Sequence, residues 1–310
     1  MARYRKRNKQ SILSAAVILL ILGILLFVYS LGDLAQAPGI PSPSPSNTVS
    51  TSAPLPTDGQ LSAVFIDVGQ GDATLIISPT GETLLMDAGE YDSAAAVLDA
   101  IESAGATRLD HVIATHPHSD HIGGLREVLE NIEWGTLYMP DATHTSQTFI
   151  RLLEYVDEQN REIEIVSAGD SIPLGGVTAE VLAPQYKEYE NLNNYSITIK
   201  ITHGETSLLL TADNEALSER EMIASGADLS CTLLTLPHHG SRTSSTADFL
   251  KATTPKYIII SLGADNLYGH PHEEVLKRLS DTDAEIFRTD LNGNIYAESD
   301  GKTLSVRPER

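Results

Sequence analysis

Apolar residues are distributed along the chain in three different ways. Residues 12–31 form one predominantly apolar run without a charged side chain, whereas residues 38–57 hold almost no bulky apolar side chain. From Leu61 onward, short apolar runs alternate with polar turns. A run of about 20 apolar residues can cross the core of a bilayer as a helix, and a segment without bulky apolar side chains cannot bury enough surface to fold. The pattern predicts a membrane span, an extended spacer and one globular domain.

Within the globular part, two halves of similar length each place strands before helices. Short β-rich runs predict strands at residues 62–67, 73–78, 83–87, 111–115, 195–202, 207–212, 232–236 and 256–262. Helical spacing of apolar positions predicts helices at residues 93–104, 125–132, 215–224, 247–252 and 273–279, the last with Pro271 in its first turn. The closing runs at residues 285–288, 294–298 and 304–306 predict edge strands around a turn at Asn292-Gly293. Two such halves are typical of two packed sheets with helices outside.

Basic residues orient the predicted span. Five of the 21 Lys and Arg residues lie in the first ten positions, and residues 11–57 contain none. Since basic residues before a span favour a cytoplasmic N-terminus, we expect a cytoplasmic segment (1–11), a transmembrane anchor (12–31), a Pro- and Ser-rich linker (32–59) and a globular domain (60–308) outside the cytoplasm. The alternative is a signal peptide, because Ala35-Gln36-Ala37 resembles a cleavage site, and cleavage would release a secreted protein.

Charge and cysteine content restrict the possible partners. From Asp58 onward the chain has 41 acidic and 16 basic residues. Such a body repels nucleic acid at long range, so contact with phosphates requires metal ions or a local basic patch. The simpler interpretation is that this surface keeps an exported enzyme soluble. The single cysteine, Cys231, excludes an intramolecular disulfide, and its apolar neighbours predict a buried thiol.

Four potential metal ligands lie within six residues, between a predicted strand and a predicted helix: His116, His118, Asp120 and His121. Alternate residues of an extended segment point to one side, so His116 and His118 can face one ion, while Asp120 and His121 follow in the next turn. Imidazole and carboxylate ligands suit zinc, manganese or iron. This density of ligands predicts a metal site rather than a group of surface histidines that cap a helix.

The segment from His116 to His121 resembles the H-x-H-x-D-H signature of the metallo-β-lactamase superfamily. Four further segments, residues 65–73, 85–89, 237–241 and 268–272, resemble the hydrolase domain of the DNA-uptake competence protein ComEC. They occur in the family order, and the resemblance covers residues 60–308. It implies an α/β fold, a four-layer αβ/βα sandwich. The family's multi-span channel has no counterpart in the single apolar segment, so the resemblance does not imply transport.

By this resemblance, His116 and His118 bind a first metal ion, and Asp120 and His121 bind a second. Asp213 matches the carboxylate that bridges the two ions, although an Asp after a strand also commonly caps a helix. The resemblance also favours His270 as a terminal ligand of the second ion. The other histidines after predicted strands are candidates for a ligand or for the catalytic proton donor: His238 and His239.

One ligand of the superfamily is missing. Many members carry a histidine about twenty residues before the bridging carboxylate, where this chain has Asn193 and Asn194. Either amide is a candidate for a weak or water-mediated ligand, and an ordinary turn is the alternative. Metal-bound histidines donate their second N–H to a neighbouring group, most often a carboxylate. The candidates for residues that orient the ligands are Asp67, Asp72, Asp87 and Asn194.

The resemblance implies an exported hydrolase that depends on one or two divalent metal ions, zinc or manganese. Metal-activated hydroxide would attack a phosphodiester, with DNA as the first candidate substrate. Asp120, His238 and His239 are the expected catalytic residues. A catalytically weak, metal-stabilised binding module of the cell envelope or the DNA-uptake apparatus is the alternative, because the usual histidine ligand is replaced by asparagine. We expect a membrane contact through the N-terminal helix and infer no protein partner.

Overall fold

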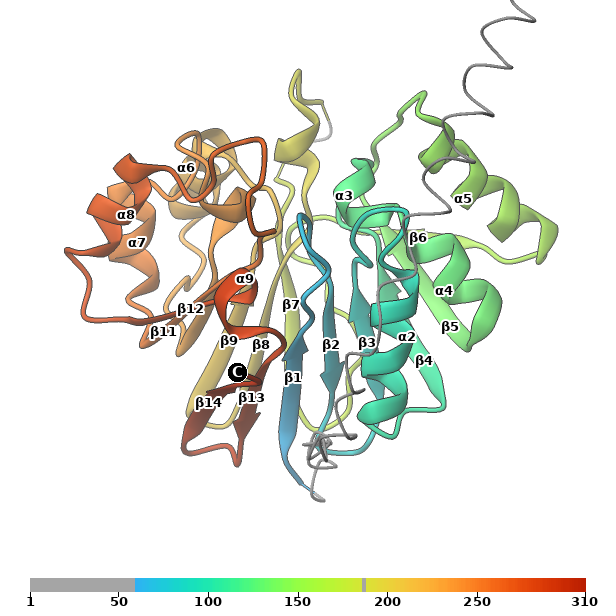
Figure 1. Cartoon of the computed structure of the whole chain (residues 1–310), viewed down its shortest axis with the longest axis horizontal. Coiled ribbons are helices and arrows are strands. Elements are labelled where there is room, and N and C mark those ends of the chain that lie inside the picture. The colour runs from blue at the N-terminus through green and yellow to red at the C-terminus, as the bar shows by residue number, and fades with distance from the viewer. Residues whose placement is uncertain (1–58, 186–187) are drawn as a thin grey trace, which may run out of the picture. The chain divides into compact units, whose positions relative to one another are not determined.

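The strands of the described residues form two sheets. The computed structural model describes residues 59–185 and 188–310 (Figure 1). The predicted cytoplasmic segment, the predicted span and all of the linker before Gly59 lie outside these residues. Within the described ranges, no helix combines the length and hydropathy needed to cross a membrane.

The first sheet has eight strands in the order β14-β13-β1-β2-β3-β4-β5-β6. Their bounds are β1 (Leu61–Phe65), β2 (Thr74–Ile77), β3 (Thr83–Met86), β4 (Arg108–Ile113), β5 (Glu133–Met139), β6 (Ile163–Ile165), β13 (Ile295–Ser299) and β14 (Leu304–Pro308). Strands β3 to β6 are parallel, and the other neighbours are antiparallel. The parallel strands therefore end at one edge of the sheet.

The second sheet has six strands in the order β12-β11-β10-β9-β8-β7. Their bounds are β7 (Thr178–Ala183), β8 (Thr198–His203), β9 (Thr206–Leu210), β10 (Leu233–Thr235), β11 (Tyr257–Ile260) and β12 (Glu285–Arg288). Strands β9 to β12 are parallel, whereas β7, β8 and β9 form an antiparallel meander. This sheet, too, has a row of parallel strands that end together.

Helices cover the outer face of each sheet (Figure 1). On the first sheet these are α2 (Ala94–Ser103), α4 (Leu125–Asn131) and α5 (Gln147–Glu158). On the second they are α6 (Ala216–Ser225), α7 (Ala247–Thr253) and α8 (Glu273–Leu279). Shorter helices lie in the connections: α3 (Ser119–Ile122), η1 (Leu192–Tyr195), η2 (Pro237–Gly240) and α9 (Thr289–Asn292).

Alternating side chains of the strands divide the apolar core into three parts. In β11, Tyr257 and Ile259 enter the core between the sheets, while Ile258 and Ile260 pack beneath the helices of the second half. A third core joins the first sheet to α2, α4 and α5. The period of two in a strand requires this division, because neighbouring residues point to opposite faces. The predicted architecture of two packed sheets with helices outside is confirmed.

The structure corrects three details of the sequence analysis. Strand β13 is not an edge strand, because it lies between β14 and β1. Asn292 ends helix α9 and does not lie in a hairpin turn, since β12 and β13 belong to different sheets. Helix α8 begins at Glu273, so Pro271 precedes its first turn. The prediction of a buried Cys231 is confirmed, and burial raises the pKa of its thiol to about 12.

Candidate metal centre

The first half of the chain contributes a loop and a short helix directly after β4. His116 and His118 lie in the loop, and helix α3 carries Asp120 and His121. The backbone of the loop after β1 approaches this helix closely, since the N–H of Asp72 donates to the carbonyl of Asp120. A Cβ atom at Gly71 would lie 2.2 Å from that carbonyl oxygen, so only glycine permits the approach. The two loops therefore form one wall of the site.

The second half contributes residues that follow β9 and β10. Asp213 comes after β9, and His238 and His239 lie in η2 after β10. Both histidines have a φ of 53°, a left-handed conformation that costs non-glycine residues about 1–3 kcal/mol each. Two further residues at the site with positive φ are Asp87 and Ala212. Strain of this kind persists where the surrounding structure imposes it, and it is frequent at functional sites.

Oxygen Oδ1 of Asp213 lies at the centre of one group of side chains, the second cluster (Asp120, His121, Asp213 and His239). It is 3.2 Å from Nε2 of His121 and 3.4 Å from Nε2 of His239, which in turn is 3.4 Å from Oδ2 of Asp120. Tetrahedral ligands about 2.0–2.1 Å from one zinc ion are about 3.4 Å apart. The spacing of these atoms therefore fits the ligand set of a single ion.

The hydrogen bonds of the second cluster leave the same atoms without partners. His121 Nε2, His239 Nε2 and Asp213 Oδ1 are buried and have no hydrogen-bond partner. The opposite nitrogens are engaged: His121 Nδ1 lies 2.8 Å from Asp87 Oδ2, and His239 Nδ1 lies 2.9 Å from the carbonyl oxygen of Ser261. With Nδ1–H donating to those acceptors, each Nε2 presents its lone pair to the cluster, as in metal-bound histidines.

Oxygen Oδ2 of Asp213 belongs to the first cluster (His116, His118 and Asp213). It lies 3.8 Å from Nε2 of His116, and that nitrogen is 2.9 Å from Nδ1 of His118. Asp213 thus offers one oxygen to each cluster, in the manner of a bridging carboxylate. It does not cap helix α6, because the cap position is Glu215 and no side chain caps it.

Charge in the site is balanced among these residues. Burial opposes an imidazolium at His121, but Asp213, Asp120 and Asp87 raise its pKa well above the usual range. In the same way, Asp213 and Asp72 outweigh burial at His239 and raise its pKa to about 9. Burial likewise opposes the carboxylate of Asp213, yet these two histidines hold its pKa well below the usual range. A bound cation would replace the two protons as the neutralising charge.

His116 and His118 differ from this pair. Burial lowers the pKa of both rings, and the nearby His121 lowers that of His116 further. Neutral imidazoles are the form that binds metals. The donor sets of both clusters therefore fit divalent ions.

Two of the predicted orienting residues lie beside the second cluster. Asp87 is fully buried and accepts hydrogen bonds from the N–H of Thr115, the hydroxyl of Thr115 and Nδ1 of His121. Asp72 is 3.9 Å from His121 Nδ1 and 4.0 Å from His239 Nδ1, and burial raises its pKa. Asp72, His121, Asp213 and His239 each offer a ligand atom, and these atoms all lie within 4.8 Å of one another, so Asp72 is a further candidate ligand of the second ion.

The other predicted residues lie farther out or point elsewhere. Asp67 contacts Arg310 at 3.3 Å and the N–H of Gly69, away from the histidines. Asn194 accepts from the N–H of Ser218 in α6, whereas Asn193 lies 3.4 Å from His238 Nε2. His270 belongs to neither cluster.

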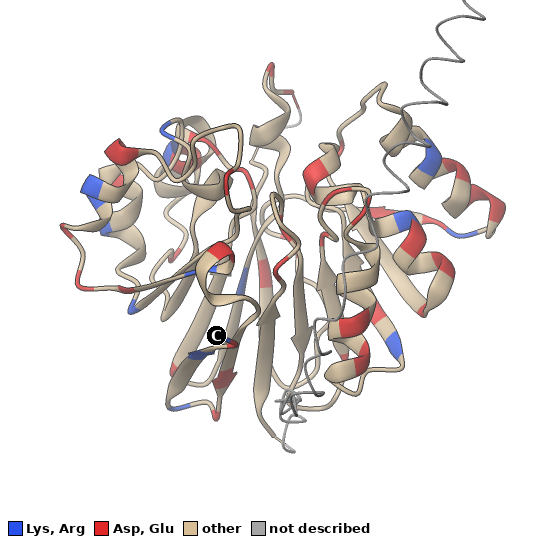
Figure 2. Ribbon diagram, in the orientation of Figure 1, with Lys and Arg blue, Asp and Glu red and all other residues tan. Residues whose placement is uncertain are grey.

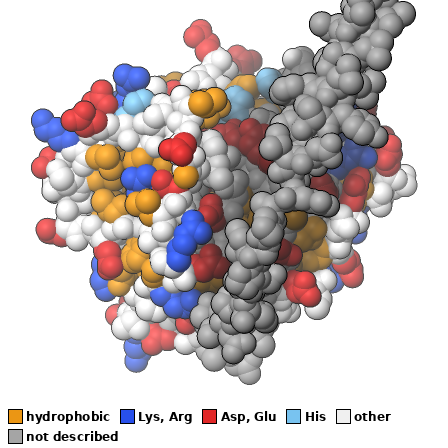
Figure 3. All heavy atoms as spheres, viewed as in Figure 1, with side chains coloured by type: hydrophobic (Ala, Val, Ile, Leu, Met, Phe, Trp, Pro, Cys, Tyr) orange, Lys and Arg blue, Asp and Glu red, His pale blue; other side chains and the backbone are white. Residues whose placement is uncertain are grey.

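A groove of about 330 Å³ opens onto both clusters. Sequence reasoning missed three residues that line it: Gln70, His144 and Tyr268. The ring of Tyr268 stacks on His270, with 5.5 Å between centroids and 21° between planes, and it is 62% exposed. The aromatic residue of the segment 268–272 was a signal that could have been used. Histidine side chains reach the surface near the upper edge of the view in Figure 3.

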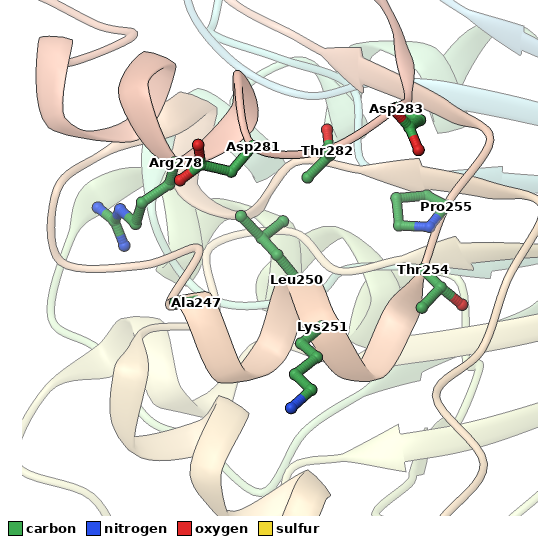
Figure 4. A pocket seen from close by; sticks show the side chains of 9 residues that line it. All are labelled: Ala247, Leu250, Lys251, Thr254, Pro255, Arg278, Asp281, Thr282 and Asp283. Carbon is green, nitrogen blue, oxygen red and sulfur yellow. The ribbon is translucent and has the colours of Figure 1, made fainter.

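A larger hollow of about 440 Å³ lies between α7 and α8, away from the clusters (Figure 4). Its lining includes Lys251, Arg278, Asp281 and Asp283, but no histidine. Within the described residues, two groups of side chains could bind a metal: Asp72, His121, Asp213 and His239, and His116, His118 and Asp213. Acidic residues outnumber basic ones in Figure 2, consistent with the sequence charge of −21.

Two curated proteins with competence names are similar in sequence to this chain. "ComE operon protein 3" of Bacillus subtilis is 29% identical over 273 residues, which are 82% of this chain and 35% of that protein. "Competence protein ComA" of Neisseria gonorrhoeae is 31% identical over 229 residues, which are 73% of this chain and 30% of that protein. The predicted resemblance to ComEC-type competence proteins is confirmed, and the chain spans about a third of the length of these relatives.

A solved structure and a family model agree on the fold. The structure of a mutant of CmlA beta-hydroxylase has a TM-score of 0.53 and 13% sequence identity, and covers 78% of this chain and 54% of that one. The model of the family "Metallo-beta-lactamase superfamily" matches residues 66–264. That range contains both sheets in large part and every residue of the two clusters, and so the chain belongs to the metallo-beta-lactamase superfamily.

Proposed function

We propose that this protein is a metal-dependent phosphodiesterase that acts on nucleic acid, and that its domain works outside the cytoplasm. The observation that carries the proposal is the convergence of three buried, unpartnered atoms: His121 Nε2, His239 Nε2 and Asp213 Oδ1. Buried polar atoms without partners are costly, so their clustering favours an ion as the missing partner. Imidazole and carboxylate donors suit zinc or manganese.

Bound at this site, one or two divalent ions would lower the pKa of a water molecule from about 15.7 towards 7 and polarise the phosphoryl group. Asp213 would contribute a ligand oxygen to each ion, because each of its oxygens faces one cluster. Asp87 keeps the lone pair of His121 Nε2 directed into the second cluster. Asp120 stays ionised, because His121 and His239 lower its pKa in spite of burial.

Proton transfer to the leaving oxygen requires a ring nitrogen that is not otherwise engaged. Both nitrogens of His239 are committed, one to Ser261 and one to the second cluster, which argues against the predicted role of His239 as proton donor. His270 lines the groove, and its Nδ1 has no hydrogen-bond partner. Burial and the neighbouring His239 and His238 lower the pKa of His270 to about 4. At neutral pH it is therefore a neutral ring, which can orient the leaving oxygen by an N–H hydrogen bond while water supplies the proton.

Two observations favour nucleic acid as the substrate class. The relatives from Bacillus subtilis and Neisseria gonorrhoeae carry competence names, and competence is the uptake of DNA. Beside the groove, the exposed ring of Tyr268 offers a face on which a base can stack, and Leu267 next to it is fully exposed. Because the domain is strongly acidic, the ions themselves would supply the attraction for phosphate. The apolar run at residues 12–31 supports a location outside the cytoplasm.

The test is hydrolysis by the full-length protein loaded with Mn²⁺ or Zn²⁺. We expect cleavage of single-stranded DNA and of bis-p-nitrophenyl phosphate, and loss of turnover in Asp120→Ala with an unchanged circular dichroism spectrum. Asp67→Ala is the matched control, because its carboxylate faces Arg310 and not the histidines. Absence of turnover with every metal tested, at full metal occupancy, would contradict the proposal. That result would favour the metal-stabilised binding module, for which the asparagines at residues 193 and 194 are the supporting observation.

A further inference from the structure

The first cluster has fewer donors than the second. In the described residues it comprises His116, His118 and one oxygen of Asp213. The asparagines of η1 stand where many superfamily members carry a histidine, so this cluster lacks the third imidazole of those members. If the protein depends on metal as proposed above, another side chain can supply the missing nitrogen.

His238 approaches the first cluster from the second half of the chain. Its Nε2 lies 3.6 Å from Asp213 Oδ2, the same oxygen that is 3.8 Å from Nε2 of His116. Both distances are close to the separation of about 3.4 Å between tetrahedral ligands of one ion. Asp213 Oδ2 is thus the atom that joins His238 to the cluster, whereas His238 itself lies outside the group of ligand atoms within 4.8 Å of one another. The side chain of His238 is 20% exposed, so it reaches the cluster from the wall of the groove.

The other nitrogen of His238 has acceptors within reach. Nδ1 lies 3.2 Å from the hydroxyl oxygen of Thr243 and 3.5 Å from Glu215 Oε1. The same Glu215 oxygen accepts hydrogen bonds from Asn193 and from Thr243. A carboxylate behind a histidine favours the tautomer with the proton on Nδ1, which leaves the Nε2 lone pair for a metal. Asn193 supports Glu215, and its Nδ2 also lies 3.4 Å from His238 Nε2, a contact that a bound ion would replace.

The backbone of η2 explains how two consecutive histidines reach both oxygens of one carboxylate. With φ and ψ of 53° and 45° at His238, and 53° and 21° at His239, the chain turns within two residues. The N–H of His238 donates to the carbonyl of Ala212, one residue before Asp213, which ties the turn to the bridging carboxylate. As a result, His238 faces Oδ2 while His239 faces Oδ1.

We propose that His238 is the third nitrogen ligand of the first metal ion and takes the place of the histidine that is absent near Asn193. The first ion is then held by His116, His118, His238 and Asp213. Each ion then has ligands from both halves of the chain. The turn at His238 and His239 provides one ligand to each ion.

The test measures metal content and affinity in the full-length protein, by elemental analysis and by titration calorimetry with Zn²⁺ and Mn²⁺. We expect two ions in the wild type and one in His238→Ala, or a first-site affinity lower by more than the 10- to 100-fold typical of losing an outer hydrogen-bond partner. His203→Ala, at the far end of β8, is the control for loss of a histidine and should keep both ions. His144→Ala removes a groove histidine whose ring centroid is 6.3 Å from that of His118, and it should also keep both.

Two ions of unchanged affinity in His238→Ala would overturn the proposal, as would loss of the first ion in His144→Ala alone. If His238→Ala fails to fold, anomalous diffraction from the metal-loaded wild type decides the matter: a metal–Nε2 distance of about 2.0–2.1 Å supports the proposal, and one beyond about 3 Å refutes it. Neither readout uses turnover. A protein that binds two ions through His238 yet cleaves no phosphodiester would refute only the proposed function.

Discussion

Replacing Asp87 by asparagine changes one atom in the network that orients His121. Oδ1 of Asp87 accepts from the N–H of Thr115 at 2.9 Å, and an amide oxygen can keep that bond. Oδ2 accepts from the hydroxyl of Thr115 at 2.6 Å and from His121 Nδ1 at 2.8 Å. In Asp87→Asn an NH₂ group takes the place of Oδ2, so two donors face each other at His121 Nδ1.

The ring of His121 can then respond in two ways. Either Nδ1–H remains as a buried donor without an acceptor, or the proton moves to Nε2, where it blocks the lone pair that faces the second cluster. An unsatisfied buried donor costs about 1–3 kcal/mol, and 1.4 kcal/mol corresponds to a factor of ten in affinity. We therefore expect the ion of the second cluster to bind about 5- to 150-fold more weakly, in line with the 10- to 100-fold typical of such partners.

Titration calorimetry with Zn²⁺ on the full-length protein measures this loss, with circular dichroism to confirm the fold. Asp67→Asn is the matched control and should bind metal as the wild type does, because Asp67 contacts Arg310 and Gly69 and neither cluster. If Asp87→Asn binds both ions within about threefold of the wild-type affinities, the argument from the tautomer of His121 is wrong.

Three further predictions concern the groove and the core. Tyr268→Ala should raise KM for single-stranded DNA about tenfold through lost stacking, with Tyr268→Phe near wild type; equal KM values for all three would contradict base stacking at this ring. Burial raises the pKa of Glu219 above 4.5, so the folded protein binds that proton more tightly than the unfolded chain. Relative to Glu219→Gln, the wild type should therefore lose stability as pH rises from about 4.5 through the raised pKa, and urea unfolding that shows a constant difference from pH 4 to 8 would refute this. Phe249→Ala should cost about 3–5 kcal/mol in urea unfolding, because this side chain of α7 is fully buried in the core of the second half; a loss below about 1 kcal/mol would contradict that packing.

Elements with a strong local pattern were predictable from the sequence. The predicted bounds of α8 and β12 match the structure residue for residue. Strands β5 to β7 were not predicted: β5 begins with a glutamate and contains Gly135, and β6 has three residues that are all at least partly exposed. Only glycine fits at position 135, since a Cβ atom there would lie 2.2 Å from the carbonyl oxygen of Asp110 on the neighbouring strand β4. Whether such segments form strands depends on tertiary packing, which the sequence pattern does not show.

Helix α5 is a different case, because its pattern was present in the sequence. Ser146 caps it through the N–H of Phe149, and Phe149, Leu152 and Val156 are buried at helical spacing. A helix over residues 147–158 was therefore predictable from the sequence.

Part of the candidate site was also predictable from the sequence, and part was not. The segment from His116 to His121 could be recognised because its ligands are close in sequence. The contact of His121 with Asp213 joins residues 92 positions apart, and it depends on how the two sheets face each other. The pairing of His239 with one cluster and His238 with the other depends on two positive φ angles. No residue type in the segment 237–241 requires those angles, so they could not be predicted.

Because each half of the domain supplies part of both clusters, a bound ion would cross-link the two halves. The chain has one cysteine and no internal disulfide to tie these halves together. A ligand present at about 100 times its dissociation constant stabilises the folded state by about 2.7 kcal/mol. When the metal is scarce, the two sheets would then be held together less firmly and the hydrolytic activity would be lost. The resistance of the domain to proteases would therefore depend on the concentration of metal in its surroundings.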